Sequence, residues 1–156
     1  MAKKKVLVLT NGQIEQLQPG DFIEAAEIPQ LTNDNAGALV IGTPVYSSSN
    51  NGVDKARANA VGTANVIGLV ADASIAPAAV GGVQFDGTLE ATTGEWDAVT
   101  GQVGGLVKDT FYYLDTATAG MLTPTAPSTA GQFVACVGIA ISTTELKITL
   151  QPRIKL

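Results

Sequence analysis

The clearest pattern in the sequence is a strict alternation near its C-terminal end. Over residues 145–151, Leu146, Ile148 and Leu150 fall on one side of an extended chain and polar side chains fall on the other, as in a strand with one face in a core. Residues 133–141 are a nearly unbroken run of apolar and small residues, which indicates a strand buried on both faces. The three residues between them, 142–144, fit a hairpin loop.

A second hairpin is predicted at the N-terminal end. Residues 6–10 and 13–17 flank Asn11-Gly12, the dipeptide that best tolerates the positive φ angles of a type I′ turn. The following Gln18-Pro19-Gly20-Asp21 is typical of a turn and could act as a hinge for exchange of the hairpin between copies. We therefore expect a projecting N-terminal hairpin arm over residues 1–20 and a single β domain over residues 21–156.

The rest of the pattern is also that of strands. Further strands are predicted at 22–28, 38–46, 66–74, 83–91 and 110–115. Helical periodicity is nearly absent, but Thr92 and Glu95 have the spacing of a capping box and predict one short helix over 95–99 that Gly101 ends. The expected fold class is all-β, a small β-barrel or β-sandwich with the hairpin arm and one short helix.

A weak internal repeat relates residues 38–72 to residues 106–142. In both segments a strand ending in tyrosine (Tyr46, Tyr113) is followed by a glycine turn and then by an apolar strand with a central glycine (Gly68, Gly138). A glycine inside a buried strand indicates a bulge, a bend or a close backbone approach. The alternative is coincidence, since short patterns of this kind recur in β-rich chains.

Composition and charge exclude several classes of protein. The chain has 156 residues, 15% charged residues and a formal net charge of −5, so phosphate backbones would repel it and we expect no nucleic acid partner. No apolar run approaches the length of a membrane span, and the basic N-terminus precedes only four apolar residues, which does not predict a signal peptide or a membrane partner. A neutral, polar surface is typical of a building block that contacts copies of itself or a lattice.

The residues needed for catalysis and for metal binding are scarce. Histidine is absent and Cys136 is the single cysteine, so a zinc site, a Ser-His-Asp triad and an intrachain disulfide are excluded. Cys136 lies in an apolar strand and is interpreted as an inert core residue. The acidic residues are scattered, so we expect no enzyme and no cofactor; a glycan hydrolase would need two carboxylates that converge in a cleft.

Three other segments have a simple interpretation and a functional one. Asn33-Asp34-Asn35 has the composition of a calcium loop but lacks regularly spaced oxygen ligands, and is interpreted as an ordinary loop. The glycine pairs in Val80-Gly81-Gly82 and Val103-Gly104-Gly105 are interpreted as turns. Trp96 is expected to be a core anchor, with a sugar-binding platform as the alternative.

The only run of charge is Lys3-Lys4-Lys5. The simple interpretation is a solvated terminus. The functional interpretation is an anchoring arm, in which Lys3, Lys4 and Lys5 lie along an acidic neighbouring surface and help the domain to dock on a larger assembly.

The order Gly42-Thr43-Pro44-Val45-Tyr46, then Asn51-Gly52-Val53, then Val66-Ile67-Gly68-Leu69-Val70 resembles bacteriophage capsid cement or head decoration proteins. Residues 111–115, 119–123 and 137–140 resemble a β module of phage fibre and other virion proteins. The resemblance covers roughly residues 38–156.

The resemblance implies a structural protein of the virion without enzymatic activity. Its copies, as homotrimers, are expected on the outer surface of the capsid, where they bridge subunits of the major capsid protein and stabilise the head after synthesis in the bacterial host cytoplasm. The alternative is a tail-fibre or head-fibre module that binds host surface glycans, for which Trp96, Tyr112 and Tyr113 are the candidate aromatic residues.

Overall fold

The structure is a computed structural model that describes residues 28–156 and, before them, strands β1 (Leu7–Thr10) and β2 (Gln13–Gln16). The two strands pair antiparallel, with Leu9 opposite Ile14, which confirms the predicted pairing of these segments. The Asn11-Gly12 turn, the Gln18–Asp21 turn and the predicted strand at 22–28, up to residue 27, lie outside the described residues. The projection of the arm is therefore still a prediction.

Five strands form a closed barrel in the order β3-β6-β5-β7-β9. Their bounds are Gln30–Asn33 (β3), Pro44–Ser49 (β5), Gly52–Lys55 (β6), Val66–Val70 (β7) and Val80–Gln84 (β9). β3 closes the barrel because it pairs parallel to β6 and antiparallel to β9. A short ladder of β4 (Leu39–Val40) and β8 (Ser74–Ile75) lies beside it.

The barrel interior is filled by branched aliphatic side chains. One valine from each of four strands is completely buried there, and Leu39 and Ile75 of the short ladder complete the cluster. The valines are Val45, Val53, Val70 and Val83. The interior of the barrel is therefore occupied by side chains, as in other small barrels.

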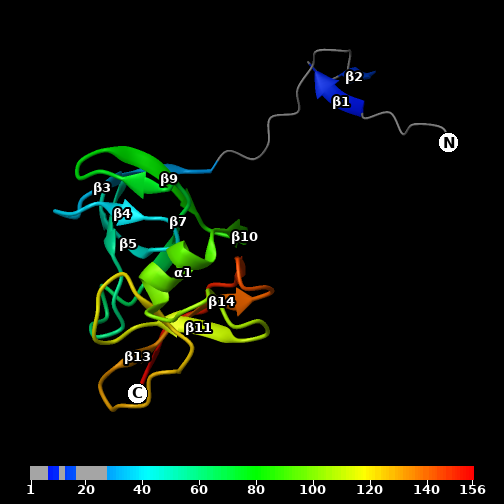
Figure 1. The fold of residues 1–156 in the computed structure, drawn as a ribbon. Coiled ribbons are helices and arrows are strands. Elements are labelled where there is room, and N and C mark those ends of the chain that lie inside the picture. The colour runs from blue at the N-terminus through cyan, green and yellow to red at the C-terminus, as the bar shows by residue number, and fades with distance from the viewer. Residues whose placement is uncertain (1–6, 11–12, 17–27) are drawn as a thin grey trace.

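The second layer is an open five-stranded sheet in the order β10-β15-β14-β11-β12. Its strands are Gly87–Glu90 (β10), Phe111–Leu114 (β11), Leu122–Thr123 (β12), Cys136–Ala140 (β14) and Glu145–Ile148 (β15). β13 (Phe133–Val134) pairs with β16 (Ile154–Lys155). Barrel and open sheet lie at different levels of the molecule, with α1 between them in the view of Figure 1.

The single helix, α1 (Thr93–Thr100), begins at the predicted capping box. Thr92 accepts a hydrogen bond from the Glu95 backbone N–H, and the Glu95 carboxylate accepts one from the Thr92 backbone N–H at 2.8 Å. Gly101 ends the helix in the left-handed conformation, with φ 67°. The helix buries Trp96 and Val99 in the larger of the two cores, under the open sheet.

Several predicted strands are shorter or divided in the structure. The segment 38–46 is split by the turn at Gly42, where a positive φ of 80° is combined with close contact to Trp96. The segments 66–74 and 83–91 are split in the same way, after Val70 and around Phe85-Asp86, and Ala135 interrupts 133–141. The glycine pair Gly81-Gly82, predicted as a turn, lies inside β9. The all-β class and the single short helix are confirmed.

The two segments of the predicted repeat have the same strand register. β5 pairs with β7 so that Val45 lies opposite Gly68, and the register shifts directly after that pair. β11 pairs with β14 so that Tyr112 lies opposite Gly138, and the register again shifts directly after it. Each central glycine is thus opposite the residue that precedes a bulge. Descent from a duplication is still a prediction.

Candidate functional site

The described residues contain no cluster of side chains suited to holding a metal ion. Within 28–156 no cluster of three or more Asp, Glu, His or Cys side chains could hold a metal ion, and every buried side-chain nitrogen and oxygen has a hydrogen-bond partner. No helix in the described part of the chain is long and apolar enough to cross a membrane. Loops, aromatic side chains and exposed surfaces of the described residues are the candidate sites.

The Asn33–Asn35 loop is held together by its own polar side chains. Asn33 is buried, and its amide donates to the carbonyl oxygens of Gly37 and Ile75. The Asp34 carboxylate accepts hydrogen bonds from the hydroxyls of Ser48 at 2.6 Å and Ser49 at 2.7 Å, which lower the pKa of that carboxyl. These contacts tie the loop to β5 and account for its composition without a calcium ion, in agreement with its interpretation as an ordinary loop.

The aromatic residues proposed for glycan binding are mostly inaccessible. Trp96 is 0% exposed, and its indole N–H donates to the Thr144 carbonyl at 2.9 Å. Tyr112 is also 0% exposed; its hydroxyl donates to the Gln102 side chain at 2.6 Å and accepts from the Val107 backbone N–H at 2.9 Å. Trp96 is therefore a core anchor, and of the three candidates Tyr113 alone is partly exposed.

Cys136 is a buried free thiol. Burial raises its pKa, which keeps the thiol protonated, and 7% of the residue is exposed. A neutral, inaccessible thiol is a poor nucleophile. This agrees with the interpretation of Cys136 as an inert residue of the core.

The outer face of the open sheet carries apolar side chains that no part of the described chain covers. Phe111 on β11 lies opposite Ile139 on β14, and alternation along each strand places Tyr113 and Ile141 on the same face. Phe111 is 47% exposed and Ile141 43% exposed, while Tyr113 and Ile139 are half-buried. We call these four residues the outer apolar face.

Beyond the outer apolar face, the same side of the sheet becomes charged. Lys147 on β15 lies opposite Ile139, and Glu145 lies opposite Glu90 of the edge strand β10. Sequence reasoning singled out Tyr113 of the outer apolar face, as a candidate for glycan binding, and missed the other three residues. The signal was present, because residues 111–114 are apolar on both sides of the strand, which in a sheet with one core requires a second covering surface.

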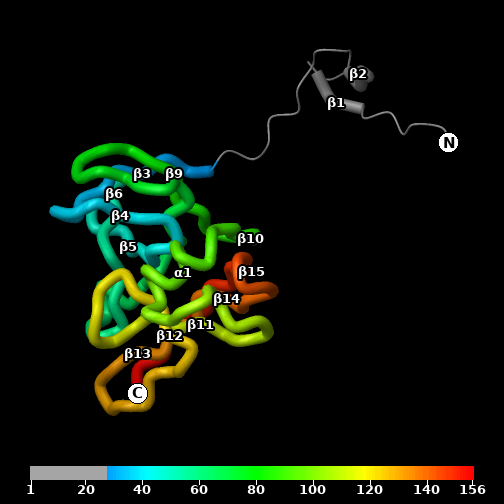
Figure 2. The backbone as a smooth tube through the Cα atoms, viewed as in Figure 1, coloured from blue at the N-terminus to red at the C-terminus, as the bar shows by residue number. Residues whose placement is uncertain are grey.

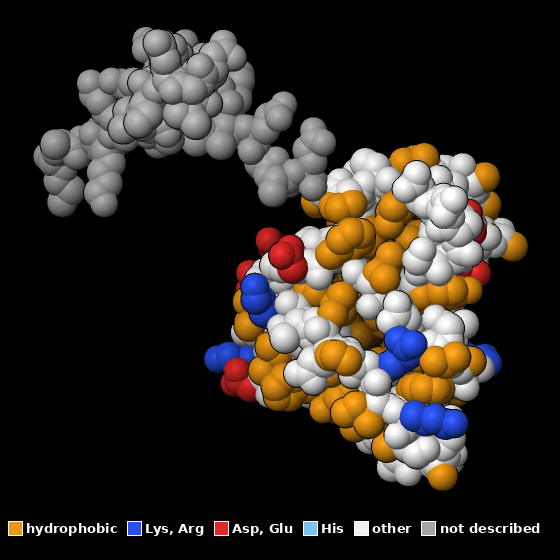
Figure 3. Space-filling view, turned by 180° about the vertical axis from the view of Figure 1, so that it is seen from behind, with side chains coloured by type: hydrophobic (Ala, Val, Ile, Leu, Met, Phe, Trp, Pro, Cys, Tyr) orange, Lys and Arg blue, Asp and Glu red, His pale blue; other side chains and the backbone are white. Residues whose placement is uncertain are grey.

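A second exposed region lies at the opposite end of the molecule from β3 and β9, near the C-terminal strand (Figure 2). There Val61, Phe133, Pro152, Arg153 and Lys155 line an open cavity of about 560 Å³. The view of Figure 3 shows Lys and Arg side chains next to hydrophobic ones on one face of the molecule. We call this the Arg153 cavity; sequence reasoning singled out none of its residues.

Lys3, Lys4 and Lys5, the candidate anchoring arm, lie outside the described residues. Their role in anchoring is a prediction that rests on the sequence.

A solved phage structure is similar in fold to this chain. No protein-family model matches the chain, and no curated protein matches it. A solved structure titled "The capsid of Myoviridae Phage XM1" is similar to this chain at 19% sequence identity and a TM-score of 0.43, over 88% of this chain and 93% of that one. Function is therefore inferred from the chain's own residues.

Proposed function

We propose that the chain is a structural protein of a phage virion that decorates the outer surface of the capsid, binds the lattice of the major capsid protein and stabilises the head. The observation that carries the proposal is the outer apolar face on an otherwise well-packed domain. Two cores are complete without Phe111 and Ile141. Since a soluble β domain gains nothing from exposing large apolar side chains on a sheet face, this face is suited to contact with another protein.

The free energy that the outer apolar face could contribute to binding can be estimated from Phe111. A phenylalanine side chain buries about 200 Å² when fully covered, so covering the exposed 47% of Phe111 removes roughly 90 Å² from water and contributes about 2 kcal/mol. Such a contact is weak for a single copy. Copies repeated over a shell add up through avidity, which is how a small domain without catalytic groups could strengthen a large lattice.

The low charge of the chain is consistent with the same role. With 15% charged residues, many surface positions are neutral Ser, Thr, Asn, Ala and Gly, which are desolvated on binding at lower cost than charged side chains. Because the core of a protein interface is depleted in charge, such a surface can be covered from more than one side. This supports contact both with the shell and with further copies, for which a trimer is the proposed arrangement.

Electron cryomicroscopy of the intact particle tests the proposal directly. We expect density of the size of this domain to recur over the icosahedral shell, with three copies around each binding position. Density confined to the tail or to one vertex would overturn the decoration role and favour a fibre module, and absence of the chain from the particle would overturn a virion role altogether.

A binding experiment with matched variants tests the face itself. Heads that lack the protein are incubated with the purified chain and sedimented, and the bound fraction is measured for the chain with Phe111→Ser and Ile141→Ser. The control is Val80→Ser, which removes a 61% exposed valine from the barrel. We expect the double variant to bind at least about tenfold more weakly and the control to bind normally; equal binding by all three chains would contradict the proposed face.

A further inference from the structure

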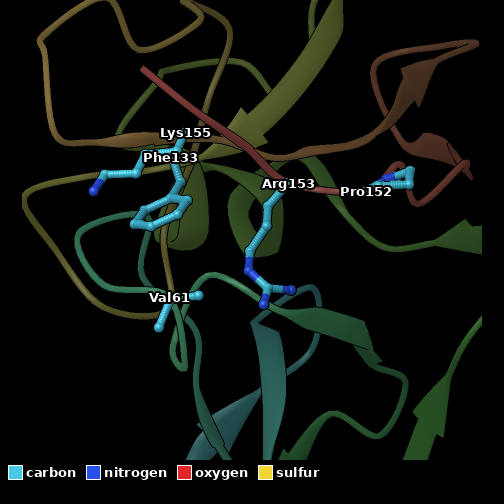
Figure 4. Close-up of a pocket in the computed structure, with 5 residues that line it drawn as sticks. All are labelled: Val61, Phe133, Pro152, Arg153 and Lys155. Atoms are coloured by element: carbon cyan, nitrogen blue, oxygen red, sulfur yellow. The ribbon is translucent and has the colours of Figure 1, made fainter.

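The Arg153 cavity combines positive charge with exposed apolar surface. Its walls come from three segments that are distant in sequence: the loop before β7 supplies Val61, β13 supplies Phe133, and the end of the chain supplies Arg153 and Lys155. In Figure 4 the Phe133 ring and the Arg153 guanidinium are both directed toward the side of Val61, and the Lys155 side chain extends away from them. An apolar group and an anion could be bound there side by side.

The arginine in this cavity has a neutral partner. The Arg153 guanidinium donates to the side-chain oxygen of Asn65 at 2.6 Å, so it is oriented by a hydrogen bond that leaves its positive charge available. Arg57, at the start of the same loop, likewise donates to a carbonyl oxygen, that of Ala117. Guanidinium groups held in this way favour carboxylate partners, which they can bind with two parallel hydrogen bonds.

The cavity is basic in an acidic chain. The two charged residues that line it, Arg153 and Lys155, are both cations, whereas the protein has a net charge of −5. Electrostatic complementarity therefore favours an acidic partner at this end of the molecule.

The sequence itself contains a segment of the matching chemistry. Residues 21–27, Asp-Phe-Ile-Glu-Ala-Ala-Glu, carry three of the fourteen acidic residues and two large apolar ones. In an extended chain Phe22 and Glu24 project from the same side about 7 Å apart. A segment with that spacing can place an aromatic ring against Val61 and Phe133 while its carboxylate meets Arg153.

The segment cannot reach the cavity of its own chain. It ends next to Ile28, which lies beside β3 and β9, whereas the cavity lies by β13 and the C-terminus at the other end of the domain (Figure 1). A domain of this size is about 35 Å across, and seven extended residues span at most about 25 Å. We propose that the Arg153 cavity binds residues 21–27 of a second copy of this chain, so that neighbouring copies are linked by exchanged segments.

Disulfide trapping in purified full-length protein tests this link without any capsid. The single native cysteine, Cys136, is 7% exposed, so a thiol placed on the surface is the reactive one. One chain carries Phe22→Cys and a second, distinguishable chain carries Val61→Cys; we expect a disulfide-linked heterodimer. The control is Val103→Cys, at a valine that is 97% exposed; equal trapping at positions 61 and 103 would overturn the proposal.

Charge reversal tests the proposed recognition. Arg153→Glu in the Val61→Cys chain is expected to lower the initial rate of trapping by about tenfold, and Glu24→Lys in the other chain is expected to restore it. Lys108→Glu, the same change of charge elsewhere, should leave the rate unchanged. An unchanged trapping rate in the Arg153→Glu variant would refute the link between copies. A disulfide that forms within one chain when both cysteines are placed in it would also refute it. Neither result bears on binding to a shell.

Discussion

The central glycines of the two matching strands, Gly68 and Gly138, are positions where one added methyl group should have a large effect on stability. A Cβ atom added to Gly68 would lie 2.6 Å from the carbonyl oxygen of Gln84 on β9, and one added to Gly138 would lie closer still to the carbonyl oxygen of Lys147 on β15. Both obstacles are backbone atoms of the adjacent strand. They cannot rotate away as a side chain would, so the ladder itself must move.

The loss in the free energy of unfolding can be estimated from these contacts. Overpacking a closely packed interior costs about 1–3 kcal/mol, and each ladder hydrogen bond weakened by the movement of the strands costs about 1 kcal/mol more. We therefore expect Gly68→Ala and Gly138→Ala each to lower the free energy of unfolding by about 3 kcal/mol, which is a fall in Tm of about 10 °C for a chain of this size.

Matched controls separate the contact from the general effect of replacing glycine. Gly62 and Gly94 have no atom within 4 Å of the added Cβ, and their φ angles are not positive. Gly62→Ala should change the free energy of unfolding by less than about 0.5 kcal/mol, and Gly94→Ala should raise it by up to about 1 kcal/mol because alanine favours α1. Gly131 is as open but has φ 87°, so Gly131→Ala should cost about 1 kcal/mol from backbone strain alone.

Urea unfolding followed by the fluorescence of Trp96 measures all five variants, because the single tryptophan is completely buried in the folded chain. From these contacts we expect Gly68→Ala and Gly138→Ala to be far less stable than the three control variants. If Gly138→Ala unfolded at the same urea concentration as Gly62→Ala, the close approach of β14 and β15 would be refuted as the reason for a glycine in this strand.

Three further predictions concern the hydrogen bonds of Tyr112 and Thr92 and the burial of Cys136. Tyr112→Phe removes a hydroxyl with two buried partners and should cost about 2 kcal/mol in urea unfolding, while Tyr113→Phe, on the exposed side of the same strand, should cost less than about 0.5 kcal/mol. Thr92→Ala should cost about 1 kcal/mol at neutral pH. The Thr92 backbone N–H and, less strongly, the Thr92 hydroxyl lower the pKa of Glu95, so that carboxylate stabilises the cap above its ordinary pKa of 4.5 and ceases to do so as the pH falls through its lower folded value. Thr92→Ala removes only the hydroxyl, so the part of its cost that comes from the hydroxyl contact with Glu95 should disappear in acid. Cys136 should react with a thiol reagent at the rate of unfolding, and fast labelling of the folded chain would contradict its burial.

Much of the fold could be predicted from short-range pattern. The alternation around Leu146 and Ile148 places both side chains in the core, and the capping box at Thr92 starts the helix within two residues of the predicted segment. Both signals are local, because a strand's period and a helix cap depend on neighbours in sequence. The predicted hairpin of the last long strands is found as β14 paired with β15.

The wrong predictions of strands and turns lie where tertiary contacts determine the local backbone conformation. Gly42 divides a segment that reads as one strand, because Trp96 of the helix packs against this glycine and the chain turns there with a positive φ. Gly81 and Gly82 read as a turn, yet they lie in β9, where Ile75 and Asp72 occupy the space that side chains would need. In the sequence, a glycine required by the close approach of another segment cannot be told from a glycine required by a turn. Only the residues packed against the glycine distinguish the two cases.

The outer apolar face lies on one of two halves of the chain that share a strand register but differ in closure. In the first half β3 joins β6 to β9 and closes a barrel, so both edges of that sheet are paired and its inner face is filled by valines. In the second half no strand of the described residues joins β12 to β10, and the sheet is open with one face on the large core. An open sheet of the same construction must leave its other face to solvent or to a partner. On that face the apolar side chains of Phe111 and Ile139 lie opposite one another across β11 and β14, and this is why the attachment surface is proposed on the open half of the molecule.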